Sequence, residues 1–415
     1  MKPSWIIWTA VFSFMCAWPT GGGATPIAYT FALIADSNEP GGSFNSNIFP
    51  AINSTGAVAF EGFTQTGVEG IFVGSGGALT TVATNGPGSP FAFFGPGGQA
   101  GPVINADGTV AFIGWLKAGG QGILVGSGGP VTMVAETVLL SESFQGVDIN
   151  DAGIVAFGRQ SPGGAAILAS SNGMFTKIAE TAFIFGGVSI SNPGVVAFVS
   201  PLPTTDAILF TGSGGGLTPI VFTSVAGPFF QLGSFSINTE GAVAFQAFLA
   251  HTNLVEGNGI FVGSGGPIMT IADDSGPYFL FDGPSINADG VVAFRAILDS
   301  GGVGIFTGAD PALDRVIVTG EPLFGSIVRT LVFGGGNALN DAGQLTFFAG
   351  LEDGRTVLVR ADPAAVPEPS TVLCLASALV GLLGYRSLGK KTKLSIRSMS
   401  AIPSMRKVSR RRLNG

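Results

Sequence analysis

The sequence predicts an all-β fold, a seven-bladed β-propeller built from four-stranded antiparallel blades, on three observations. A phrase of the form N-x-x-G-x-x-A-F recurs seven times along the chain. Successive copies lie 41 to 53 residues apart, close to the length of one four-stranded blade. A segment that resembles the last strand of a repeat stands before the first copy, as expected for a ring that its own N-terminus closes.

The repeated phrase predicts a tight turn followed by a strand. Its copies are INSTGAVAF (52–60), INADGTVAF (104–112), INDAGIVAF (149–157), ISNPGVVAF (190–198), INTEGAVAF (237–245), INADGVVAF (286–294) and LNDAGQLTF (339–347). Asn caps such a turn and Gly takes its left-handed position, which is typical of a type I turn with a G1 bulge. We therefore expect a structural role in the turns for Asn53, Gly56, Asn105, Gly108, Asn150, Gly153, Gly194, Asn238, Gly241, Asn287, Gly290, Asn340 and Gly343.

The residues after each turn complete a blade. A second phrase follows, such as GIFVGSGG at 70–77, and then a further short strand, LTTVAT at 79–84 in the first unit. One unit is thus strand, N-x-x-G turn, strand, loop, strand, GSGG turn, strand. Ala and Phe at the end of the phrase point to opposite faces of their strand and fill the space between neighbouring sheets. Ser191 in place of Asn and Thr346 in place of Ala are expected to be tolerated variants.

The ends of the array indicate how the ring closes. The seventh unit ends at TVLVRAD (356–362) and lacks its last strand, whereas YTFALIAD (29–36) matches that strand and precedes the first turn. We expect a propeller over residues 29–362, in which the N-terminal strand completes the last blade and leaves no open edge between the ends. Rings of six or eight blades and a β-solenoid are the alternatives, but a solenoid needs polar capping units that neither end shows.

Composition agrees with many short strands and excludes one class of partner. Glycine accounts for 66 and phenylalanine for 34 of the 415 residues, and only 11% are charged. From residue 29 to residue 369 the chain has 8 basic and 26 acidic residues, a formal charge of −18, which argues against binding to nucleic acid. Both cysteines, Cys16 and Cys374, lie in the terminal apolar segments, so the body cannot form a cysteine metal cluster.

The N-terminus has the pattern of a secretory signal peptide. Lys2 precedes an apolar run from Trp5 to Trp18, and small residues follow up to Ala24. The run is short for a membrane span. We expect residues 1–28 to be removed on export; an uncleaved anchor is the alternative.

The C-terminus carries a second targeting pattern. A linker (363–369) ends in Pro367, Glu368 and Pro369; an apolar segment (370–386) and a basic tail (387–415) follow. This order resembles the PEP-CTERM sorting signal, in which the apolar segment is a transmembrane helix and the tail is cytoplasmic. The resemblance implies an inner-membrane anchor before processing by an exosortase-type enzyme, and then association with the cell surface or with exopolysaccharide. This chain departs from the pattern by continuing well past the basic cluster, to residue 415.

The body is similar to proteins with NxxGxxAF tandem repeats, which occur with C-terminal anchors that include PEP-CTERM. The similarity covers residues 29–362, with seven copies of the phrase. It implies a class and a location, and no activity.

The residues that could carry chemistry are few. His251 is the only histidine, no catalytic triad can be assembled, and GSGG is a turn without the features of a phosphate loop. The acidic residue of the turns changes position between copies and lacks calcium-loop spacing. We therefore expect no catalytic residue, cofactor or metal site. The candidates for ligand contact are non-repeating polar residues: Glu61, Arg159, Gln246, Arg295, Asp206, Asp273, Asp274 and Asp282.

Two functions fit this sequence. The first is a non-enzymatic, exported propeller at the cell surface that either contributes to the extracellular matrix as a structural module or binds carbohydrate or protein, with Arg159 and Arg295 as hypothetical contacts to an anionic sugar on the ligand face. The alternative for both arginines is a purely structural role, at a solvated strand position or in an ion pair. The second function is a propeller hydrolase or lyase acting on polysaccharide, which needs paired carboxylates, or a base and a charge neutraliser, in the channel.

Overall fold

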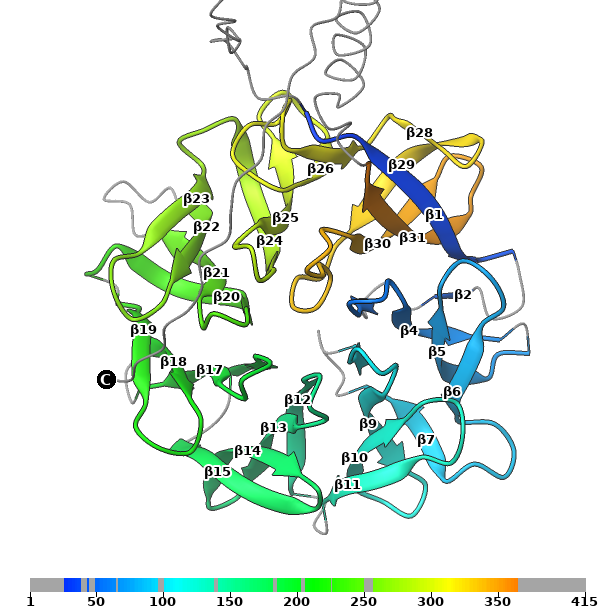
Figure 1. The fold of residues 1–415 in the computed structure, drawn as a ribbon, viewed down its shortest axis with the longest axis vertical. Coiled ribbons are helices and arrows are strands. Elements are labelled where there is room, and N and C mark those ends of the chain that lie inside the picture. Colours follow the sequence, from blue (N-terminus) through cyan, green and yellow to red (C-terminus); the bar gives the residue numbers. More distant parts are fainter. Residues whose placement is uncertain are drawn as a thin grey trace, which may run out of the picture. The chain divides into compact units, whose positions relative to one another are not determined.

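The computed structural model describes residues 26–364 except 39–42, 45–48, 65, 96–100, 138–140, 182–184, 203–205, 225 and 250–256. In this part the chain forms seven antiparallel sheets around a central axis (Figure 1). The seven-bladed propeller is confirmed, and the alternatives of six or eight blades and of a solenoid are wrong. Most of the leader, the Pro-Glu-Pro motif, the apolar segment 370–386, the basic tail and His251 lie outside the described residues. Among the described residues, no helix has the length and apolar character needed to cross a membrane.

Each blade contains four main strands, and the strand that precedes the repeated phrase lies nearest the axis (Figure 1). Blade 1 contains β2 (Ser43–Phe44), β3 (Ala51–Ile52), β4 (Val58–Phe63), β5 (Glu69–Gly74) and β6 (Thr80–Thr84), and blade 2 contains β7 (Phe91–Phe94), β8 (Val103–Ile104), β9 (Val110–Leu116), β10 (Gln121–Gly126) and β11 (Thr132–Glu136). Blade 3 contains β12 (Ser143–Ile149), β13 (Val155–Ser161), β14 (Gly164–Ser171) and β15 (Met174–Thr181). Blade 4 contains β16 (Phe185–Ile190), β17 (Val196–Pro201), β18 (Ala207–Gly212) and β19 (Thr218–Phe222). Blade 5 contains β20 (Phe229–Ile237), β21 (Val243–Leu249), β22 (Gly257–Gly263) and β23 (Met269–Asp273). Blade 6 contains β24 (Tyr278–Ile286), β25 (Val292–Leu298), β26 (Val303–Phe306) and β27 (Arg315–Val318). Blade 7 contains β28 (Pro322–Leu323), β29 (Ser326–Val332), β30 (Leu345–Leu351), β31 (Thr356–Pro363) and β1 (Tyr29–Asp36).

The N-terminal strand closes the ring. β1 is the outermost strand of blade 7 and pairs antiparallel with β31 along its length, from Tyr29 opposite Pro363 to Asp36 opposite Val357. β31 thus extends one residue beyond the boundary at 362 that the sequence predicts. An ion pair of 2.9 Å between Arg355 and Asp36 joins the two strands at one end. The segment that leads into blade 1 is therefore held to blade 7 by backbone hydrogen bonds and not by side-chain packing alone.

Neighbouring blades pack through the Ala and Phe of the repeated phrase. Ala59 of blade 1 shares a buried cluster with Phe112 of blade 2, and Ala111 of blade 2 shares the next with Phe157 of blade 3. The same small-to-large contact recurs from blade to blade: Ala156–Phe198, Ala197–Phe245, Ala244–Phe294 and Ala293–Phe347. Because the phrase puts a small and a large side chain on opposite faces of one strand, each repeat fits the next.

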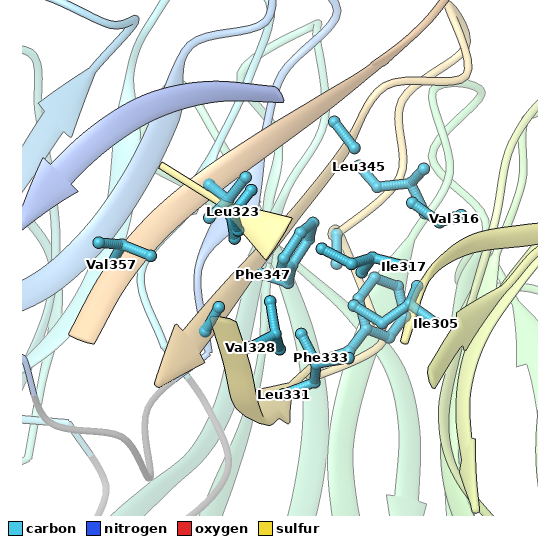
Figure 2. Packing of buried hydrophobic residues seen from close by; sticks show 14 of the residues in the cluster. Ile305, Val316, Ile317, Leu323, Val328, Leu331, Phe333, Leu345, Phe347 and Val357 are labelled. Atoms are coloured by element: carbon cyan, nitrogen blue, oxygen red, sulfur yellow. The ribbon is translucent and has the colours of Figure 1, made fainter. Parts of the chain in front are cut away.

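Figure 2 shows the contact between blades 6 and 7. Phe347 of β30 lies among Ile305 and Ile317 of blade 6 and Leu331 and Phe333 of blade 7, all of them buried. At the last contact, between blades 7 and 1, Thr346 takes the place of Ala. Its hydroxyl is completely buried and donates a hydrogen bond of 3.2 Å to the carbonyl of Val359. This partner explains how a polar residue fits the position.

The inner strands are less regular than the phrase predicts. β-Bulges interrupt the pairing of β12, β16, β20 and β24, and in blades 1 and 2 the inner edge is split into two short strands. Glycines let these segments crowd around the axis. A Cβ on Gly146 (φ +67°) would lie 2.6 Å from Cα of Gly187, and a Cβ on Gly283 (φ +28°) would lie 2.9 Å from the carbonyl of Gly334. The bulges thus bring backbone from several blades into contact at the centre.

Candidate functional site

The N-x-x-G turns form one end of the central channel. In the first turn the amide of Gly56 donates to the carbonyl of Asn53, the amide of Asn53 donates to the carbonyl of Ala57, and Gly56 has a φ of +80°. Oδ1 of Asn53 accepts from the amides of Thr55 and Ala57. This is a type I turn with a G1 bulge and a side-chain cap. The other six turns have the same backbone hydrogen bonds and a glycine with positive φ.

The motif asparagines have a second role, in holding the ring together. Their Nδ2 groups donate to a backbone carbonyl in the next blade: Asn53 to Asn105, Asn105 to Asn150, Asn150 to Ser191, Asn238 to Asn287, Asn287 to Asn340, and Asn340 to Asn53. The oxygen atom of each amide therefore caps its own turn while the nitrogen atom binds the neighbour. We call this set the amide ring. It passes from blade 7 to blade 1, so it also spans the closure.

The amide ring has one gap, between blades 4 and 5. Ser191 stands where the other repeats have Asn, and its hydroxyl accepts from the amide of Val195, which replaces the cap within the turn. The shorter side chain has no second polar atom to donate to blade 5. Ser191 thus replaces the cap within its own turn, but it makes no hydrogen bond of the amide-ring type to blade 5.

Ser191→Asn should complete the amide ring and stabilise the protein by about 0.5–1.5 kcal/mol, the usual net value of one hydrogen bond. The reverse change in the neighbouring blade, Asn150→Ser, is the matched control and should cost a similar amount. Chemical denaturation of the three proteins measures both. Equal stability of the Ser191→Asn variant and the parent would show that the gap has no energetic consequence.

A cavity of about 320 Å³ lies on the axis at the other end of the channel, and we call it the main cavity because several blades meet there; a larger space of about 440 Å³ lies off the axis, between blades 2 and 3. Its walls come from six blades, namely the inner segments of blades 1 to 5 and residues 334–337 of blade 7. They include Phe49, Gln145, Val188, Ser234 and Phe235, with glycines at 146, 187 and 334–336. This lining is mostly apolar groups and backbone, and Gln145, Ser189, Ser234 and Asn337 add neutral polar groups. A concave, partly polar site of this size, at the meeting point of several blades, is typical of a small-ligand pocket.

Asp148 is the single charged residue among the described residues that line this cavity. It is 3% exposed, and its carboxylate accepts hydrogen bonds from the amides of Ile149 and Ile190, both at 2.8 Å, and from Nδ2 of Asn337 at 2.6 Å. Burial raises the pKa of Asp148 to about 6, because desolvation of the charged form outweighs these hydrogen bonds. The residue therefore changes charge close to neutral pH.

A short segment of blade 7 crosses the channel between the main cavity and the end with the N-x-x-G turns. We call residues 334–337 the strap. The carbonyl of Gly336 accepts from the hydroxyls of Ser236 in blade 5 and Ser285 in blade 6. The carbonyl of Asn337 accepts from the amide of Ile52 in blade 1, and its side chain reaches Asp148 in blade 3. The strap thus connects blade 7 to four others.

The arginines that the sequence suggested as ligand contacts lie outside this cavity. Arg159, on β13, forms an ion pair of 2.9 Å with Glu142. Arg295, on β25, pairs with Asp282 and donates from Nε to the carbonyl of Leu331 in blade 7, at 2.9 Å. The structure thus gives both guanidinium groups carboxylate partners within the protein and gives Arg295 a role between blades.

Arg295 and Asp282 are thus two of the candidates that the structure brings together, whereas Gln246, Glu61 and Asp273 lie in separate places. Gln246 donates from Nε2 to the carbonyl of Phe281 in the next blade. Glu61 is buried in β4, at 1% exposure. Asp273 accepts from the backbone and hydroxyl of Ser275 in an exposed turn. The carboxylate of Asp151 accepts from the amide of Ala106 in the previous blade, as a cap between turns.

Comparison with known proteins shows which family the chain belongs to and which solved structures have a similar fold. Residues 17–373 match a family of unknown function, DUF7453. The chain belongs to this family. No curated protein matches it.

Three solved structures are examples of chains similar to this DUF7453 protein, and the first two, with TM-scores above 0.5, illustrate its fold. The β-propeller domain of the Trilobed protease from Pyrococcus furiosus, described as having an open velcro topology, is 12% identical with a TM-score of 0.52, over 77% of this chain and 95% of that one. An oligogalacturonate lyase in complex with manganese is 12% identical with a TM-score of 0.51, over 83% and 99%. TolB from Acinetobacter baumannii is 14% identical with a TM-score of 0.39, over 62% and 64%, so the chain spans less than two thirds of it. At these identities the likeness concerns the fold.

The sequence offered a weak signal for the cavity and the strap. F-G-G-G-N (333–337) is the one place where three consecutive glycines precede a repeated phrase, and Asp148 is the only acidic residue directly before the first apolar residue of a phrase. Both features break the repeat. Neither indicates by itself that residues 189 positions apart meet at the channel axis.

Proposed function

We propose that this DUF7453 protein is an exported, cell-surface β-propeller that acts as a binding module and holds a neutral, hydroxylated ligand, such as one sugar unit of an exopolysaccharide, in its central cavity. The observation that carries the proposal is the cavity itself. It is about 320 Å³, which is near the lower end for ligand pockets, and it is lined by residues that the repeat does not specify. Bulge glycines there leave backbone groups within reach of a ligand.

The charges favour a neutral or cationic ligand over an anionic one. The described residues of the lining include the Asp148 carboxylate and no basic side chain. The body has a formal charge of −18 between residues 29 and 369, which disfavours the approach of an anion. Arg159 and Arg295, the contacts suggested for an anionic sugar, are paired with Glu142 and Asp282 instead.

A polysaccharide hydrolase or lyase is the second candidate function. One related fold is that of an oligogalacturonate lyase, and a lone buried acid with a raised pKa can serve as a proton donor. A glycosidase, however, needs two carboxyl groups on either side of the scissile bond. The described lining supplies one, and both its oxygens already accept hydrogen bonds from the protein. Binding without turnover is therefore the better-supported function.

Calorimetry with neutral, amino and uronic oligosaccharides tests the proposal. We expect binding of a neutral or amino oligosaccharide, with no product formed on incubation. Ser234→Trp, which fills the cavity, should abolish binding, whereas Ser213→Trp, on an exposed turn of blade 4, should not. Binding that survives Ser234→Trp would place the ligand elsewhere, and cleavage of the oligosaccharide would favour the enzyme.

The location is proposed from the two ends of the chain. We infer export through the leader (1–28), transient anchoring by the apolar segment (370–386), and processing by an exosortase-type partner at Pro367, Glu368 and Pro369. A double variant, Pro367→Ala with Pro369→Ala, should accumulate in the inner-membrane fraction. Normal release of this variant to the surface would contradict sorting through the motif.

A further inference from the structure

The channel contains two cavities that share one wall. The main cavity of about 320 Å³ is lined from one side by Gly336 and Asn337, and a second cavity of about 120 Å³, at the end with the N-x-x-G turns, is lined from the other side by the same two residues. The strap is thus the partition between two spaces on the same axis.

The strap has fixed ends and a glycine-rich middle. On one side Phe333, and on the other Ala338 and Leu339, are buried in the cluster between blades 6 and 7. Gly335 and Gly336 both have positive φ, at +65° and +62°. Glycine backbones have a wider range of accessible conformations than other residues, so the middle can change path while the ends stay in place. The packing of the ends makes them natural hinges.

The middle of the strap has no apolar side chain and is held by hydrogen bonds and by close packing on its glycines. The hydrogen bonds are those of the Ser236 and Ser285 hydroxyls to the Gly336 carbonyl, of the Ile52 amide to the Asn337 carbonyl, of the Gly336 amide to the Pro284 carbonyl, and of the Asn337 side chain to Asp148. The side chain of Phe49 packs on Gly334 and the backbone of Gly283 on Gly335, so opening also breaks these two contacts. Each such hydrogen bond has a small net value, because water replaces it when it breaks. No apolar side chain of the strap itself has to leave a core for it to move.

We propose that the strap is a gate, which swings away from Asp148 and joins the two cavities into one channel through the propeller. In the closed form Asn337 covers the carboxylate. In the open form water reaches it. The gate goes beyond the proposed function, since it does not depend on which ligand the main cavity holds.

The charge on Asp148 sets the direction in which pH moves the gate. In the closed form burial raises the pKa of this carboxyl to about 6, whereas contact with water in the open form returns the pKa toward its ordinary value of 3.8. The closed form therefore binds the proton more tightly. Acid favours closure, and the advantage is lost as pH rises through about 6. The difference between the two pKa values allows a change in the opening equilibrium on the order of 100-fold.

Other titratable groups near the partition are few and separately held. Asp151 and Asp341 line the second cavity. Their carboxylates accept from the amides of Ala106 and Ala288, at 2.8 Å in both cases. The described walls of the main cavity contribute Asp148 only. The pH response of the strap is therefore expected to follow this one residue.

Hydrogen exchange of the whole protein at pH 5 and pH 7.5, corrected for the intrinsic rates, tests the gate. The amides of Gly336 and Ile52, which donate to Pro284 and to the strap, should lose protection at the higher pH, by about 10-fold, the part of the full change that falls between these two pH values. The amide of Gly241, in a turn of blade 5, is the control and should not change. Protection of Gly336 and Ile52 that is the same at both pH values would overturn the proposal.

Two variants separate the gate from general unfolding. Asp148→Asn should remove the pH dependence at Gly336 and Ile52; a dependence that persists would overturn the role of this residue. If Asp148→Asn does not fold, Asn337→Ala decides the matter. It should lower the protection of Gly336 at both pH values while Gly241 stays protected, and unchanged protection of Gly336 would show that the side chain does not hold the strap.

Discussion

Deletion of residues 29–36 should destabilise the whole propeller by at least about 5 kcal/mol and lower its melting temperature by about 10 °C or more. The deletion removes β1 and with it every backbone hydrogen bond along the outer edge of β31. It also withdraws Ile34 and Ala35 from the buried cluster that contains Phe60 and Phe72 of blade 1. Arg355 is left without its partner Asp36. Differential scanning calorimetry of the protein with and without the strand measures the effect.

The same experiment has an internal control and a rescue. Thr30→Ala changes an exposed residue of β1 and should alter stability by no more than about 0.5 kcal/mol. A synthetic peptide with the sequence YTFALIAD, added to the deletion protein, should raise its melting temperature by occupying the vacant edge. Melting of the deletion protein at the parent's temperature would show that the ring does not depend on this strand.

Phe347→Ala should cost about 3–5 kcal/mol, the range for removing a large aromatic side chain from a packed core. Phe347 is fully buried between blades 6 and 7 and touches Phe31 of β1 edge to face, with ring centroids 6.3 Å apart. One substitution therefore weakens two contacts, that between the blades and that with the closing strand. Denaturation in guanidinium chloride gives the change in the free energy of unfolding.

Phe279→Ala is the matched control for this change. Phe279 is also a phenylalanine on a strand, but it is 67% exposed on β24. Its removal should alter stability by no more than about 0.5 kcal/mol. Similar losses from Phe347→Ala and Phe279→Ala would mean that burial between the blades does not determine stability in this ring.

The parts of the fold that repeat could be predicted from the sequence because their causes are local. A type I turn with a G1 bulge favours Asn and Gly three residues apart; that spacing is visible six times, and in the seventh case, the fourth copy, Ser191 stands in place of Asn. The contact of each Ala with the next Phe follows from the two-residue period of a strand. Even the ring closure could be predicted, since the unmatched strand at 29–36 had one vacant place to fill.

The centre of the ring could not be predicted in the same way. The contact of Asn337 with Asp148 joins residues on opposite sides of the ring, and neither residue belongs to the repeated phrase. The second role of the motif asparagines was also missed, because the turn alone accounts for Oδ1 and gives no sign of where Nδ2 points. For Arg295 the sequence shows a charge that breaks the pattern, but only the structure shows Asp282 and the Leu331 carbonyl beside it.

The position of β1 determines how much of the chain must be synthesised before the ring can close. β1 is the first strand to be synthesised, and its partner β31 is the last. A chain that stops anywhere before residue 356 leaves both an orphan strand and an unfinished blade, each with exposed backbone groups that other sheets can pair with. Closure therefore requires a chain that extends through β31, to residue 363. Chains that end earlier keep exposed strand edges and are expected to aggregate or to be degraded.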